Sequence, residues 1–192
     1  MLVSGPAQVL TADSDPIFPA GHFNFGYIDS DAYTGSITYA PVDSSGGFWS
    51  WTSPGYTIGS GNFTPTKVTG IADTGTSLFL LPSSLVEAYY NVVSGAKYDN
   101  SQGGYTLPCS SAAPGFSFGV NDANILITVP GEYIKYAPVT SSGRTCYGGL
   151  QSDSGIGFSI FGDVALKAAF VVFDGGKQQL GWAPKKLNLT SG

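Results

Sequence analysis

From Phe23 onward, short apolar runs alternate with clusters of Gly, Pro, Asp and Ser. Short runs bounded by such turn residues are typical of β-strands joined by tight turns. We predict strands at residues 23–28, 36–39, 48–53, 56–58, 68–72, 78–81, 116–118, 125–129, 146–151, 158–161, 170–173 and 180–182. Strands that follow one another this closely predict an all-β domain built from antiparallel sheets.

Two segments interrupt the strand pattern and predict short helices. Ser84 and Glu87 have the spacing of a capping box, which predicts a helix after Pro82 that stops near Gly95. A second short helix is predicted at residues 164–169, with Asp163 as its N-cap.

The composition fits a folded protein and excludes several classes of partner. Of the 192 residues, 42% are hydrophobic and only 11% are charged, which argues against disorder. The net charge is -5 and basic residues do not cluster, so we expect no nucleic-acid partner. The longest apolar runs are shorter than the roughly 18 residues of a membrane span, so we expect no membrane partner. Scarce Lys and Arg suit a protein that works in acid, because fewer cations then repel one another.

The segment Asp73-Thr74-Gly75 has the clearest chemical content. It joins two apolar runs, so the Asp73 carboxylate is expected on a rigid turn at the end of a buried strand. Gly75 allows close approach of the backbone, and a hydroxyl of Thr74 or Thr76 can hydrogen-bond across the turn. The tripeptide on its own is also a common turn, so these residues alone leave a purely structural role open.

The chain has two cysteines, Cys109 and Cys146. An even number in a chain rich in Ser and Thr and poor in Lys suggests one disulfide and an oxidising compartment. Two unrelated buried thiols are the alternative that the residues leave open.

Several segments together resemble the second lobe of the pepsin-like aspartic proteases. These are Ile-Ala-Asp-Thr-Gly-Thr-Ser-Leu at 71–78, Ile-Phe-Gly-Asp-Val-Ala-Leu at 160–166, the runs at 170–174 and 180–183, and those at 25–29 and 33–37. The sequences of these segments are most similar to those of secreted fungal members of the endothiapepsin and penicillopepsin type. The resemblance implies that residues 23–186 form a C-terminal lobe, with 1–22 as a linker or adapted N-terminus and 187–192 as a tail.

The resemblance also assigns roles to individual residues. Asp73 is expected to be one of two catalytic aspartates in acid-pH hydrolysis of peptide bonds. Gly75 and Thr76 are expected to bind the substrate backbone, while Thr74, Gly162 and Asp163 support the site. Apolar pockets are expected to be lined by Leu80, Ile156, Phe158 and Ile160, for which core packing is the alternative. A disulfide between Cys109 and Cys146, secretion, and the absence of any metal or cofactor complete the expectation.

The chemistry of this family needs a second carboxylate, and the chain does not supply it in a suitable setting. The tripeptide Asp153-Ser154-Gly155 is similar in sequence to Asp73-Thr74-Gly75, but no apolar strand leads into it. We therefore interpret it as a loop. Three interpretations follow: a protease lobe that works with an N-terminal lobe, a non-catalytic lobe that binds peptides or proteins, or a homodimer with two copies of Asp73. The isolated chain is expected to be inactive under the first.

Overall fold

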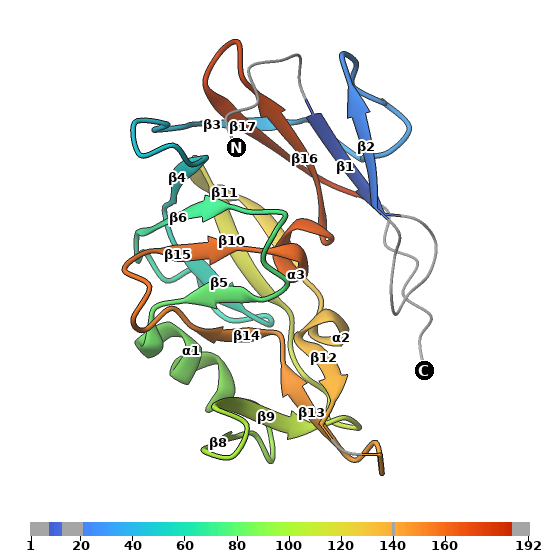
Figure 1. Ribbon diagram of the computed structural model, residues 1–192, viewed down its shortest axis with the longest axis vertical. Helices are drawn as coiled ribbons and strands as arrows, with labels where there is room; N and C mark the ends of the chain where they lie inside the picture. The colour runs from blue at the N-terminus through green and yellow to red at the C-terminus, as the bar shows by residue number, and fades with distance from the viewer. Residues whose placement is uncertain (1–7, 13–20, 140, 186–192) are drawn as a thin grey trace.

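A computed structural model describes residues 8–12, 21–139 and 141–185. These residues form seventeen strands and three short helices in four sheets: one at each end of the long axis of the molecule and two side by side between them (Figure 1). Among the described strand pairs, all but two are antiparallel. The predicted all-β class is therefore confirmed.

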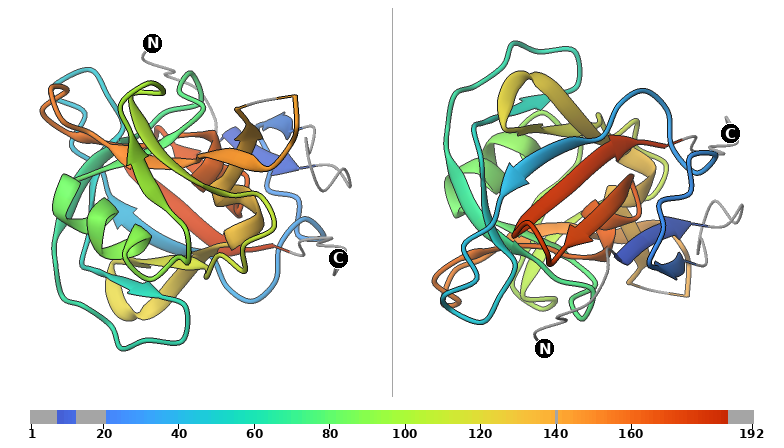
Figure 2. Two further views of the ribbon diagram at one scale, coloured as in Figure 1. Left: turned by 90° about the horizontal axis from the view of Figure 1, so that it is seen from below. Right: turned by 90° about the horizontal axis from the view of Figure 1, so that it is seen from above.

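The sheet at one end unites the two ends of the described chain. Its order is β2 (Gly21–Phe25), β1 (Gln8–Ala12), β16 (Ala169–Asp174), β17 (Gln179–Pro184) and β3 (Thr38–Pro41). Figure 2 shows its blue and red strands side by side from above. The structure describes residues 8–12 and 21–22 of the predicted linker 1–22, and both segments lie in strands. Local sequence does not reveal this, because β1 pairs with β16, which is distant in the sequence. The predicted tail 187–192 lies outside the described residues.

Two central sheets enclose the core. One has the order β14 (Leu150–Ser152), β7 (Phe79–Leu81), β15 (Ser159–Phe161), β6 (Val68–Ala72) and β4 (Ser50–Ser53); the other consists of β11 (Asp122–Val129), β10 (Phe116–Val120) and β5 (Tyr56–Ile58). Buried aromatic rings fill the space between them, with Trp51 in contact with Phe118, Phe161 and Trp182 at centroid distances of 5.9, 4.7 and 5.1 Å. Such ring pairs add about 0.5–1.5 kcal/mol each beyond the burial of their area, so they hold β4 and β15 firmly against β10 and β17.

The fourth sheet carries the disulfide. Its order is β12 (Lys135–Pro138), β13 (Thr145–Gly148), β9 (Gly104–Pro108) and β8 (Lys97–Asp99). Cys109, directly after β9, is bonded to Cys146 on β13, with their Cα atoms 5.0 Å apart. The expected disulfide is thus present in the structure.

We predict that replacing both cysteines by Ala lowers the free energy of unfolding by about 2–4 kcal/mol, because the bond closes a loop whose ends are 37 residues apart. Chemical denaturation of the variant and of the oxidised wild type measures the difference. Reduced wild type is the control, and it must unfold as easily as the variant. A loss below about 0.5 kcal/mol would contradict the prediction.

The helices are α1 (Ser83–Tyr90), α2 (Gly131–Ile134) and α3 (Asp163–Leu166). The predicted caps are wrong: Pro82 and Gly162 occupy the N-cap positions of α1 and α3, without a side-chain capping bond. In α3 the cap is unnecessary, because the amides of Asp163 and Val164 donate to the carbonyls of Thr76 and Ser77 instead. Only two helices were predicted, because α2 is a single turn after a proline and has no periodicity to detect.

Candidate active site

Asp73 lies directly after β6, on the turn that leads to β7. Its backbone amide donates to the carbonyl of Phe161 at 3.2 Å, which ties the turn to β15. One carboxylate oxygen, Oδ1, accepts the amide hydrogen of Gly75 at 3.0 Å, and Oδ2 accepts the hydroxyl hydrogen of Thr76 at 2.7 Å. The half-buried carboxylate is therefore held in one orientation by its own turn. Of the two candidate hydroxyls, Thr76 makes this bond, whereas Thr74 is exposed.

Gly162 lies directly beneath this turn. A Cβ atom at this position would lie 2.3 Å from the carbonyl oxygens of both Thr76 and Leu78, so only glycine fits. The amide of Asp163 donates to the Thr76 carbonyl at 2.8 Å. The structure thus brings Asp73, Gly162 and Asp163 together from segments that are far apart in the sequence.

Asp163 has a perturbed carboxyl group. Although the residue as a whole is exposed, partial desolvation raises the pKa of its carboxyl above the ordinary value of 3.8. The Lys167 ammonium opposes this shift, and the Asp73 carboxylate adds to it. A raised pKa in the folded state means that the folded state binds this proton more tightly than the unfolded chain does.

We therefore predict a pH-dependent effect of Asp163→Asn on stability. The stabilisation from the Asp163 proton is fully present below pH 3.8 and is lost as the pH rises through the folded-state pKa. Relative to wild type, the variant is expected to gain stability between acid and neutral pH. Urea denaturation of both proteins at a series of pH values measures the difference, and a difference independent of pH would contradict it.

An apolar face begins beside Asp73. Ile160 on β15 stands opposite Leu80 on β7 and Ile71 on β6, so these three side chains lie in one row across the sheet. Ile160 is only 8% exposed, whereas Phe158 and Ile156 are 36% and 42% exposed. The structure therefore brings the predicted Leu80 and Ile160 together and leaves the other two predicted residues open to solvent.

Sequence reasoning missed Phe48 as a member of this face. Its half-exposed ring lies 5.8 Å from that of Phe158. The signal was present in the aromatic run Phe48-Trp49, which was interpreted only as a strand.

The topology excludes Asp153 as a partner for Asp73. Strand β6 is parallel to β15, β15 is antiparallel to β7, and β7 is parallel to β14. Strands β6 and β14 therefore run in opposite directions, and the residues after them, Asp73 and Asp153, lie at opposite edges of the sheet. The interpretation of residues 153–155 as a loop agrees with this geometry.

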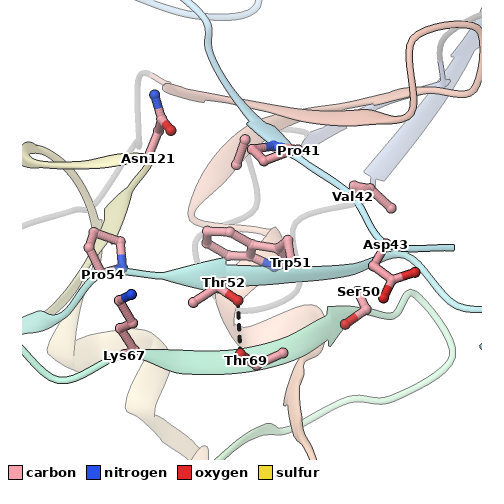
Figure 3. Close-up of a pocket in the computed structure, with 11 residues that line it drawn as sticks. Pro41, Val42, Asp43, Ser50, Trp51, Thr52, Pro54, Lys67, Thr69 and Asn121 are labelled. Atoms are coloured by element: carbon pink, nitrogen blue, oxygen red, sulfur yellow. Dashed lines mark hydrogen bonds between the residues drawn. The ribbon is translucent and has the colours of Figure 1, made fainter.

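A separate cavity of about 490 Å³ lies between β3, β4 and β6 (Figure 3). Its lining includes Asp43, Lys67 and the hydrogen-bonded pair Thr52 and Thr69. None of the predicted site residues is among the described residues that line it.

Comparison with known proteins shows the family to which this chain belongs. Residues 13–185 match the family model of the eukaryotic aspartyl proteases, and the chain belongs to that family. It is 55% identical over 180 residues to endothiapepsin of Cryphonectria parasitica and 53% identical over 165 residues to penicillopepsin-2 of Penicillium janthinellum. These alignments cover 93% and 86% of this chain but only 42% and 41% of the relatives. The chain thus spans less than half the length of these curated relatives.

The fold likeness extends to a solved structure. The aspartic proteinase from Irpex lacteus superposes with a TM-score of 0.75 over 96% of this chain and 58% of its own, at 24% identity. Within the part of the chain that the structure describes, none of the helices has the length and apolar character that a membrane span requires.

Proposed function

We propose that this chain supplies one half of the active site of an aspartic endopeptidase, with Asp73 as its catalytic carboxylate. The observation that carries this proposal is the setting of Asp73: it is fixed by Gly75 and Thr76 on a turn that rests on Gly162, in a chain of this family. Because the chain belongs to this family, a catalytic role for Asp73 is favoured over the purely structural role that the turn alone left open.

The reaction explains why one lobe is not enough. Two adjacent carboxylates cannot both ionise easily, so they share one proton. The ionised member removes a proton from a water molecule, and the protonated member donates to the carbonyl of the peptide bond. The pair titrates as a unit, so neither role belongs permanently to Asp73. The second carboxylate must come from a first lobe, which we propose as the partner of this chain.

The terminal sheet offers a surface for that partner. The alternate residues Phe23 and Phe25 on the edge strand β2 are 52% and 60% exposed, and Tyr27 beyond it is also exposed. An exposed group of aromatic side chains favours association with another protein surface. We place the docking of the first lobe on this sheet.

The substrate is an extended polypeptide. Gly75, which is exposed, and Thr76, which is half-buried, are proposed to bind its backbone. Apolar side chains of the substrate are expected to lie against Leu80, Ile156, Phe158 and Ile160, together with Phe48. The disulfide supports secretion, because such bonds persist in oxidising compartments.

A cleavage assay tests this function. The purified chain is incubated with a denatured protein near pH 3–4 (the acid range in which a carboxylate pair can share a proton), alone and after co-refolding with the first lobe of a related fungal enzyme. We expect cleavage that pepstatin inhibits, and only in the co-refolded sample. An inactive assembly in which both lobes are bound would contradict the proposal and favour a non-catalytic binding lobe.

A further inference from the structure

We propose that Asp153 is a positioning residue, which holds the loop that carries Ile156 and Phe158 and thereby sets which apolar substrate side chains the cleft accepts. This inference rests on the proposed function, because it concerns the same apolar face. It assigns a role to a carboxylate that the catalytic dyad does not use.

Asp153 binds its surroundings at three points. Its backbone amide donates to the carbonyl of Leu81 at 2.9 Å, which anchors it to the end of β7. Its carbonyl accepts the amide hydrogen of Ile156 at 3.0 Å, in the middle of the loop. Its carboxylate oxygen Oδ2 accepts the hydroxyl hydrogen of Ser159 at 2.7 Å, at the start of β15. Asp153 therefore joins the beginning, the middle and the end of the loop.

One further bond lies at the start of the loop, where the Ser154 amide donates to the Ser152 hydroxyl oxygen at 3.1 Å, and two glycines follow it. Gly155 and Gly157 have φ values of +87° and +92°, and a Cβ at either would meet nothing within 4 Å. Glycine has the largest backbone freedom of all residues, so two of them in six positions make the loop easy to distort. Ser159, in contrast, is buried and lies opposite Gly70 in the sheet. The bond from Ser159 to Asp153 thus fixes a pliable loop to a rigid strand.

The position of the exposed side chains depends on this bond. Phe158 directly precedes Ser159, and its ring lies 5.8 Å from that of Phe48. Ile156 lies between the two glycines. If the bond between Asp153 and Ser159 is lost, we expect the side chains of Ile156 and Phe158 to move away from the row formed by Ile160 and Leu80.

The first test needs no activity. We expect Asp153→Ala and Ser159→Ala to increase the hydrogen-exchange rate of the Ile156 amide roughly tenfold, because a lost hydrogen bond changes local opening by about that factor. Asp153→Asn is expected to restore slow exchange, since its amide oxygen can still accept from Ser159. Asp99→Ala is the matched control, because Asp99 accepts from Ser101 in a hairpin remote from the cleft. The Gly75 amide reports that the catalytic turn is intact.

The second test uses the assembled enzyme and peptides that differ only in one apolar side chain. For Asp153→Ala we expect KM to rise roughly fivefold for the peptide with the large apolar side chain, with kcat changed by less than about twofold. The peptide with Ala at that position is expected to be cleaved as before, and Asp153→Asn to behave like wild type.

The outcomes separate this inference from the proposed function. Unchanged exchange of Ile156 in both alanine variants would overturn the role of Asp153, and so would faster exchange with an unaltered preference between the two peptides. An assembly of wild-type lobes that does not cleave at all counts against the proposed function, and the exchange rates alone then decide whether Asp153 holds the loop.

Discussion

Asp73→Asn is expected to lower the kcat of the assembled enzyme at least about a thousandfold, because it removes one of the two groups that exchange protons in the transition state. Asn has the same shape, and its side-chain oxygen can still accept a hydrogen bond from Gly75 or Thr76. The fold of the lobe and its binding of the first lobe are therefore expected to persist. Initial rates on a peptide substrate, together with circular dichroism of the variant lobe, measure both effects.

The matched control is Asp99→Asn. Asp99 also accepts the amide hydrogen of the residue two positions later, Ser101, at 2.9 Å, but it lies in the β8–β9 hairpin. This variant is expected to retain full activity. Retained turnover by Asp73→Asn, at the level of this control, would show that Asp73 is not catalytic.

Gly162→Ala is expected to lower the free energy of unfolding by about 3 kcal/mol or more, which is at or above the upper end of the usual cost of overpacking a core. The new Cβ would approach two backbone carbonyl oxygens, those of Thr76 and Leu78, to 2.3 Å. A flexible side chain could move aside, but these carbonyls belong to the turn that holds Asp73. Relief of the conflict therefore displaces the catalytic turn, and activity of the assembly is lost together with stability.

Gly46→Ala provides the comparison for this effect. An added Cβ there meets only the edge of the Phe48 ring, at 4.0 Å. Its change in unfolding free energy is expected to stay within about 0.5 kcal/mol. Equal stability of the two variants in chemical denaturation would contradict the role assigned to Gly162.

The centre of the site was accessible from the sequence because its parts are local. The strand Val68–Ala72 was predicted to the residue, and so was the turn at Asp73 that follows it. The Gly162-Asp163 pair was found through the resemblance, since no spacing rule reveals that this segment passes beneath a turn almost ninety positions earlier.

Other features depend on contacts between distant segments and could not be predicted. Strand β1 is defined by its pairing with β16, and the exposed strand β8 has no alternation of buried and exposed residues. The cap predicted at Asp163 failed because distant backbone carbonyls replace a capping side chain. Phe48 belongs to the apolar face only because folding brings it to Phe158.

The central claim is that one copy of this chain contributes one of two catalytic carboxylates. The most direct test is to separate the co-refolded material by size, and to measure acid peptidase activity and native mass in each fraction. We predict that activity coincides with a species containing one copy of this chain and one first lobe. Activity in a species made of two copies of this chain alone would contradict the account and identify a homodimer with two Asp73 residues.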